Sequence, residues 1–208
     1  MPRRLNEQAR SRLRRALIGG GLEVSAVLKA LGLFGNARGS GVIFTLHHVR
    51  PKRTDAFQPN AFLEVTPDFL ERAILILGDA GYDFVPLETI PERLAKPAER
   101  PFACFTLDDG YRDNAAFAAP VFTRHGVPFT IFLTRGFVDA SRSMWWETLE
   151  SLVAKAPRVS FDFGNGPQSL AATTRREKTA AFNRIATYVN TTNEMDAVAR
   201  LDATATKH

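Results

Sequence analysis

Short continuous apolar runs alternate with helical stripes along most of this 208-residue chain. Continuous apolar runs bounded by turn residues predict buried strands at 42–48, 84–85, 102–107 and 129–133. Helical patterns follow three of these runs, at 66–77, 87–94 and 112–125. Strands that alternate with helices predict βαβ units, and therefore an α/β fold built on a parallel sheet.

Local start and stop signals support these boundaries. Thr66 is placed to cap a helix that has Pro67 at its first position, and Gly81 lies just past the apolar stripe of that helix. Gly126 follows the helix predicted at 112–125 in the same way, with His125 as its last residue.

The last third of the chain has a different pattern. It predicts a helix at 145–155, a hairpin of 159–163 with 168–171 around Gly164-Asn165-Gly166, and a long polar helix at 173–189 followed by a weaker helical stretch. About four core strands are visible in all, which is few for a closed barrel of roughly eight. We therefore expect part of a larger (β/α) architecture.

Composition narrows the class of protein. The chain is 45% hydrophobic, enough for one domain with an appendage. No window approaches the roughly 18 apolar residues that a membrane-spanning helix requires, and no apolar segment typical of a secretory signal follows the basic start. We therefore expect a cytoplasmic protein. Cys104 is the single cysteine, and its apolar neighbours predict a small buried hydrophobe rather than a nucleophile.

The net charge of +5 belongs to the first 15 residues, which hold six Arg and one Glu, so the remainder is neutral. Residues 1–38 are expected to form a basic helical extension, with helices at 3–17 and 22–33. A solvated or packing helix is the interpretation we favour. A helix lying on a membrane surface through residues 1–15 and an arm for nucleic acid are weaker alternatives. The neutral body predicts no nucleic-acid partner.

Two adjacent carboxylates, Asp108 and Asp109, follow the apolar run 102–107 and precede Gly110. Neighbouring side chains at a strand end point in different directions, so the two acids can have different roles. One interpretation is a turn that caps the following helix. The other is a catalytic pair, in which a divalent cation compensates for partial burial.

The segment FTLDDGYRDN around these acids resembles the first motif of the polysaccharide deacetylases, carbohydrate esterase family 4, which include the nodulation-type chitooligosaccharide deacetylases. Leu107 replaces the Phe of the family pattern. GVIFTLHHV, 41–49, is similar to the family's opening strand, with Leu46 in place of Tyr. GVPFTIFLTRGFVD, 126–139, and WWETLE from Trp145 also resemble family segments, so the likeness covers about residues 40–150.

The resemblance implies a distorted (β/α) barrel, of which residues 39–208 would be the N-terminal portion. It implies a hydrolase that removes N-acetyl groups from an amino-sugar polysaccharide or chitooligosaccharide with a divalent metal, often zinc. Carried over by position, Asp108 would be the general base, Asp109 a metal ligand and His47 a residue near the substrate. Taken alone, His47 is equally compatible with a core histidine, and His48 is expected on the opposite face in a structural role.

The sequence departs from the family where a pair of closely spaced histidines should complete the metal site. After Asp109 the only histidines are His125 and His208, which are 83 residues apart. His125 is expected to be a helix C-cap. The metal site is therefore expected to be incomplete, either because the chain is truncated before that motif or because it is a catalytically inactive carbohydrate-binding or interaction protein on the same scaffold.

Overall fold

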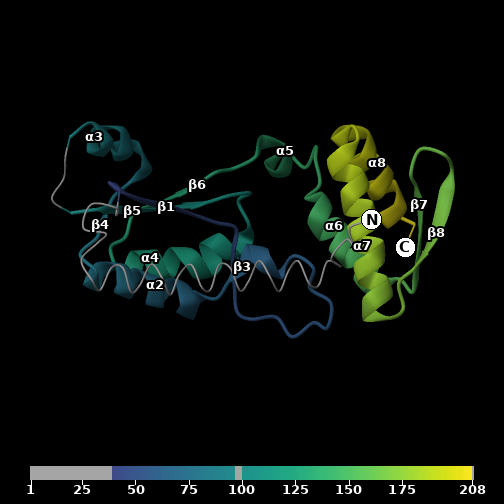
Figure 1. Ribbon diagram of the computed structural model, residues 1–208, viewed down its shortest axis with the longest axis horizontal. Coiled ribbons are helices and arrows are strands. Elements are labelled where there is room, and N and C mark those ends of the chain that lie inside the picture. Colours follow the sequence, from purple (N-terminus) through teal and green to yellow (C-terminus); the bar gives the residue numbers. More distant parts are fainter. Residues whose placement is uncertain (1–38, 97–99, 208) are drawn as a thin grey trace, which may run out of the picture.

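The computed structural model describes residues 39–96 and 100–207. These residues form two lobes that lie one after the other along the long axis of the molecule (Figure 1). We call residues 39–96 and 100–143 the N-terminal lobe and residues 144–207 the C-terminal lobe. The helices expected at 3–17 and 22–33, and with them the basic extension over residues 1–38, lie outside the described residues.

The N-terminal lobe is built on a parallel sheet. Its strands are β1 (Gly41–Leu46), β4 (Asp83–Phe84), β5 (Phe102–Leu107) and β6 (Phe129–Ile131). β1 pairs with β5 over the whole length of both strands, whereas β4 pairs with the start of β5 and β6 with its end. The α/β class with a parallel sheet is thus confirmed. Among the described residues the sheet stays open, and no closed barrel is formed.

β5 is the central strand, and all six of its residues are buried. Because its side chains alternate, Phe105 and Leu107 pack with Leu70 and Phe122 on one face. Phe102 and Cys104 point to the other face, into a small cluster with Val85 and Ile90. Two layers of apolar contacts therefore fix the strand that leads into Asp108.

Helices cover both faces of this sheet. α2 (Pro67–Asp79) and α4 (Ala119–Arg124) lie on the same side (Figure 1), whereas η2 (Leu87–Thr89) and α3 (Ile90–Ala95) pack on the other. A short helix, α5 (Arg135–Val138), lies between the lobes. Thr66 caps α2 as predicted, since its hydroxyl accepts a hydrogen bond of 3.1 Å from the Phe69 N–H.

The helix predicted at 112–125 is not one regular α-helix. A π-helical turn, η3 (Asn114–Ala118), precedes α4. Pro120 has no N–H to donate to the carbonyl four residues earlier, and a wider turn is one way in which a chain accommodates that loss. His125 is the C-cap residue of α4, as predicted.

Two strand predictions were wrong at their ends. The strand expected at 42–48 breaks at His47, after which β2 (His48–Val49) pairs in parallel with β3 (Glu64–Val65), next to the turn η1 (Ala61–Leu63). The run expected at 129–133 ends as a strand at Ile131 and is only half-buried. Neither β2 nor β3 has the length that an alternating pattern needs to be recognised.

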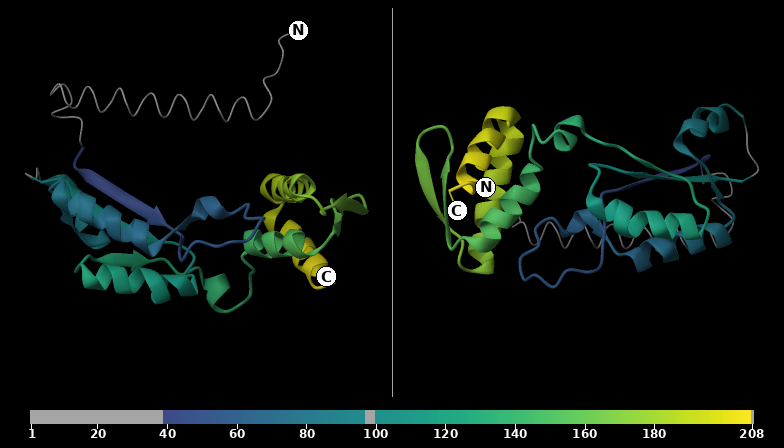
Figure 2. Two further views of the ribbon diagram at one scale, coloured as in Figure 1. Left: turned by 90° about the horizontal axis from the view of Figure 1, so that it is seen from below. Right: turned by 180° about the vertical axis from the view of Figure 1, so that it is seen from behind.

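The C-terminal lobe combines helices with a hairpin. It contains α6 (Trp145–Lys155), the antiparallel pair β7 (Arg158–Asp162) and β8 (Pro167–Ala171), α7 (Arg175–Thr191) and α8 (Glu194–Ala205). Figure 2 shows α7 and α8 packed beside α6, with the hairpin at the far end. Phe57, from a loop of the N-terminal lobe, is buried in this second core. In the described part of the chain, no helix is both long and apolar enough to cross a membrane.

Candidate active site between the two lobes

The segment after β5 makes a turn with two consecutive left-handed residues. Asp108 still belongs to the sheet edge, where its N–H donates a hydrogen bond of 2.9 Å to the Leu46 carbonyl. Asp109 then has a φ of 69° and Gly110 a φ of 67°. The positive φ favours glycine at position 110; a Cβ there would lie 2.3 Å from Cδ2 of the exposed Leu133, a side-chain end that can move aside.

The left-handed backbone conformation of Asp109 costs free energy, and it persists because the surrounding structure holds the residue in place. Left-handed backbone is uncommon for residues other than glycine, although Asp tolerates it better than most. Such residues concentrate at active sites and ligand clamps. In the described part of the chain, neither Asp108 nor Asp109 accepts a hydrogen bond from a backbone N–H of the helix that follows. The interpretation of this pair as a helix cap is thus not supported.

The structure brings Asp109 and His47 to the same cavity, of about 420 Å³. The cavity lies where the sheet edge meets α6 and α7, with the aromatic rings of Phe62, Trp145 and Trp146 in its wall. Asp108 is half-buried at the strand end and is not part of this wall. A larger hollow of about 550 Å³ lies along α6 beside Lys178 and contains none of the predicted site residues, so we place the candidate site at the smaller one.

The electrostatic setting of Asp109 is unusual for an exposed turn. Burial raises the pKa of its carboxyl group above the ordinary value, and the neighbouring charge of Asp108 adds to this. The charge of His47 and the Tyr111 hydroxyl act in the opposite direction but do not cancel the effect. An acid in such surroundings is stabilised as the anion when a cation or hydrogen-bond donor comes close.

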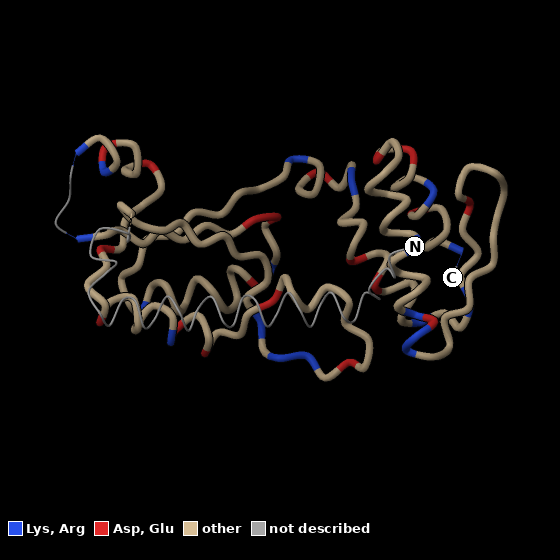
Figure 3. The backbone as a smooth tube through the Cα atoms, viewed as in Figure 1, with Lys and Arg blue, Asp and Glu red and all other residues tan. Residues whose placement is uncertain are grey.

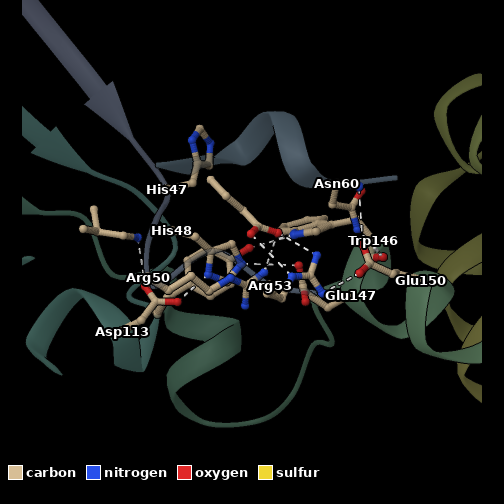
Figure 4. Close-up of polar contacts among 12 residues, drawn as sticks. His47, His48, Arg50, Arg53, Asn60, Asp113, Trp146, Glu147 and Glu150 are labelled. Atoms are coloured by element: carbon tan, nitrogen blue, oxygen red, sulfur yellow. Dashed lines mark hydrogen bonds and ion pairs between the residues drawn. The ribbon is translucent and has the colours of Figure 1, made fainter. Parts of the chain in front are cut away.

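His47 and His48 have opposite orientations, as the alternation of a strand predicts (Figure 4). The His47 ring faces the cavity, whereas His48 is 3% exposed and sits in the polar contact between the lobes. Nδ1 of His48 is 2.6 Å from Oδ2 of Asp113, and its Nε2 is 3.3 Å from Oε1 of Glu147. The ring packs against that of Tyr111, with centroids 3.6 Å apart. His48 therefore links β2 to α6.

More polar contacts cross the boundary between the lobes (Figure 4). Arg53 bridges Glu64 and the buried Glu150 at 2.6 and 2.7 Å, and the side-chain amide of Asn60 donates to the Trp146 carbonyl at 2.9 Å. The Trp146 indole N–H in turn donates to the Tyr111 hydroxyl at 2.7 Å. Elsewhere, charges of both signs are mixed along both lobes (Figure 3). The wall of the cavity is thus held by a hydrogen-bonded contact that involves both lobes.

Sequence reasoning missed four residues that position the site: Asp113, Asn114, Trp146 and Glu147. The side-chain amide of Asn114 donates to the His47 carbonyl at 2.7 Å, at the break after β1. The acidic and amide side chains that follow the Asp-Asp-Gly turn within one helical turn were the available signal, because such residues can reach back to the adjacent strand ends. Trp146 and Glu147 on α6 lie in the segment WWETLE, and the resemblance of that segment was the available signal there.

The donor set does not complete a hydrolytic metal centre. Such zinc sites use three protein ligands, and among residues 39–96 and 100–207 no group of three or more His, Cys, Asp and Glu side chains is placed to hold an ion. Asp109 and His47 together would offer two donors. Cys104 is buried, and burial raises the pKa of its thiol, as expected for a structural residue.

Comparisons with known proteins do not establish a family for the chain. No family model and no curated protein matches the chain. Among solved structures it is similar to the deacetylase PplD of Streptococcus pyogenes in complex with acetate, with 21% identity and a TM-score of 0.40 over 48% of this chain and 45% of that chain. It is also similar to a de-N-acetylase from Aggregatibacter actinomycetemcomitans, with 15% identity and a TM-score of 0.36 over 68% and 50%. The matches thus span half or less of those chains, at a similarity too low to establish a shared fold or activity.

Proposed function

We propose that this chain carries the acid-bearing part of a hydrolase that removes N-acetyl groups from an amino-sugar polysaccharide or oligosaccharide. The observation that carries the proposal is Asp109, which is held in a left-handed conformation at the carboxyl end of the central strand and shares an aromatic-walled cavity with His47. The resemblance of residues 40–150 to the polysaccharide deacetylases supports the same reaction. On this proposal the open sheet is an arc of a distorted (β/α) barrel.

On this proposal Asp108, His47 and the aromatic wall each have a role in the reaction. Water adds to the acetyl carbonyl, the C–N bond breaks, the proton taken from the water passes to the leaving nitrogen, and acetate and a free amine on the sugar result. Asp108 would accept the proton of the attacking water as general base, a role that typically contributes ~10²–10⁴-fold to a rate. His47 would contact the substrate, since its ring faces the cavity. The aromatic wall would pack against the apolar C–H face of a pyranose ring.

A divalent cation, zinc by family resemblance, remains part of the proposal, with Asp109 as its ligand. A divalent cation beside Asp109 would stabilise its ionised carboxylate, which burial disfavours. The described residues do not supply a third ligand, so we assign no reaction step to the ion.

That incomplete donor set favours a second candidate, a carbohydrate-binding protein without catalysis on the same scaffold. The cavity and its aromatic wall would serve binding equally well. The two candidates differ in acetate release, which only the hydrolase would show.

The test measures acetate released from the β-1,4-linked tetramer of N-acetylglucosamine, with and without added zinc. The full chain should release acetate when zinc is present. Asp108→Asn should lower the rate at least 100-fold and keep zinc binding, whereas Asp109→Asn should lose both. Asp79→Asn, at an exposed position at the end of α2, is the matched control and should behave as the parent chain.

Equal zinc content in Asp108→Asn and Asp109→Asn would contradict the assigned roles. Tetramer binding without any acetate release would favour the second candidate. If the chain neither binds the tetramer nor releases acetate from it, the candidate site as a whole is overturned.

A further inference from the structure

The hydroxyl of Tyr111 is a polar group at the candidate site that has no role in the proposed reaction. Tyr111 follows the Asp-Asp-Gly turn and is 9% exposed. Its ring lies against that of His48, with centroids 3.6 Å apart, and its oxygen is 2.7 Å from the indole nitrogen of Trp146. Packing therefore fixes the ring of Tyr111, and a hydrogen bond to the other lobe fixes its tip.

The direction of the hydrogen bond with Trp146 determines what the Tyr111 proton can do. An indole N–H can only donate, so the Tyr111 oxygen is the acceptor. The phenolic proton is therefore free to be donated to a second group. Burial and the charges of Asp109 and Glu147 raise the pKa of Tyr111 above its ordinary value, so the hydroxyl keeps this proton.

Two carboxylates lie near this proton, and Asp109 is the better acceptor. Oε1 of Glu147 is 3.3 Å from Nε2 of His48, so Glu147 already has a partner. Asp109 precedes Tyr111 by two residues in the turn. Burial raises the pKa of Asp109, and the nearby Tyr111 hydroxyl acts against this, as a donor to the charged form does. The hydroxyl thus has Trp146 on one side and Asp109 on the other.

We propose that Tyr111 is a positioning residue, whose hydroxyl accepts a hydrogen bond from the Trp146 indole and donates one to the Asp109 carboxylate. This inference rests on the proposed function. Asp109 and Trp146 line the same cavity from different lobes, so a hydroxyl bonded to both fixes the acid relative to the aromatic wall. The bond to Asp109 would also help to hold that residue at its φ of 69°. Tyr111 itself touches no reacting atom.

The direct test follows the indole N–H resonance of Trp146 by NMR in the full chain, without any ligand. In a chain of hydrogen bonds each bond strengthens the next, so a change at Asp109 should reach Trp146 through the Tyr111 hydroxyl. Asp109→Asn should therefore move the Trp146 resonance, because a neutral amide oxygen is a weaker acceptor than a carboxylate. Asp108→Asn removes the neighbouring charge but no partner of Tyr111, and should move it far less.

Tyr111→Phe shows whether the hydroxyl carries this effect. The substitution keeps the ring against His48 and removes only the oxygen. In this background Asp109→Asn should move the Trp146 resonance far less than it does in the parent chain. An equal movement in both backgrounds would overturn the proposal, since Asp109 would then act on Trp146 through space alone. No movement with Asp109→Asn in the parent chain would overturn it as well.

Acetate release from the tetramer shows whether this positioning serves the reaction. Tyr111→Phe should lower the rate about tenfold or more, because a small misplacement of a catalytic group can cost up to ~100-fold. Tyr82→Phe is the matched control and should keep the parent rate, since Tyr82 precedes β4 at the opposite end of β5.

The outcomes separate the role of Tyr111 from the proposed function. If the parent chain releases acetate and Tyr111→Phe does so at the same rate, Tyr111 is not a positioning residue for the reaction. If the parent chain releases none, the proposed function fails, and the resonance of Trp146 still decides whether the Tyr111 hydroxyl joins the indole to Asp109.

Discussion

His48 offers the sharpest test of how the candidate site is held together. Replacing it with phenylalanine keeps a ring against Tyr111 but removes both nitrogen atoms, and so leaves Asp113 and Glu147 without their shared partner. Removing one member of a buried ion pair typically costs ~3–5 kcal/mol. Glu147 is 32% exposed and can turn to solvent, so the lower end of that range, about 3 kcal/mol, applies here.

For a chain of this length, ~1 kcal/mol shifts the melting temperature by ~2–4 °C. His48→Phe should therefore melt about 6–12 °C below the parent chain. His125→Phe is the control. His125 also contacts a carboxylate, at 2.8 Å from Glu71, but it does so within the N-terminal lobe and with more exposure, so its loss should have a much smaller effect.

The pH dependence of this difference tests the charge on the ring. Burial opposes protonation of His48, but its hydrogen bonds to Asp113 and Glu147 outweigh that effect and hold its pKa above the ordinary value of 6.5. The folded state thus binds the proton more tightly than the unfolded chain. The resulting stability is fully present below pH 6.5 and is lost as the pH rises through the folded-state pKa.

Urea unfolding of the parent chain and His48→Phe at pH 6 and pH 9 measures this dependence. The stability difference should be larger at pH 6. A stability difference of the same size at both pH values would refute a charged His48 as the link between the lobes. If His48→Phe lowers the free energy of unfolding no more than His125→Phe does, the link itself is refuted.

Two further substitutions test the turn and the contact between the lobes. Gly110→Ala should destabilise the chain by ~1–2 kcal/mol in urea unfolding, because alanine adopts the positive φ of 67° at this position only at a cost; unchanged stability would show that the turn relaxes freely. Glu150→Ala should lower stability by ~1–3 kcal/mol, since it leaves the Asn60 N–H without its acceptor and Arg53 with Glu64 as its remaining partner at hydrogen-bond distance; a loss under ~0.5 kcal/mol would show that this bridge behaves as a surface ion pair.

Local pattern was enough to predict the elements that a continuous signal defines. The bounds of β5, Phe102–Leu107, and of α6, Trp145–Lys155, agree with the predicted ranges, because an unbroken apolar run and a helical stripe each extend over the whole element. The hairpin of β7 and β8 follows from its Gly-Asn-Gly turn in the same way. The Asp-Asp-Gly turn was also visible, since glycine after two acids at a strand end marks a sharp reversal.

The contact between the lobes could not be predicted from such patterns. His48 meets its partners 65 and 99 residues further along the chain, and no local periodicity encodes that pairing. At the break, the His47 carbonyl accepts a hydrogen bond from the Asn114 side chain, which is 67 residues away. The sequence could therefore suggest that His47 and Asp109 serve one site, but not that residues of the C-terminal lobe would supply its wall.

The position of the acetyl group in a bound saccharide shows whether the cavity that holds Asp109 and His47 is the site. The tetramer of N-acetylglucosamine, labelled with ¹³C in its acetyl groups, would be bound to the Asp108→Asn variant, in which turnover is blocked, and contacts would be measured by ¹³C-edited NOE spectroscopy. We predict contacts from an acetyl methyl group to the ring protons of His47 and Trp146. Acetyl contacts confined to other surfaces, such as the hollow beside Lys178, would contradict it.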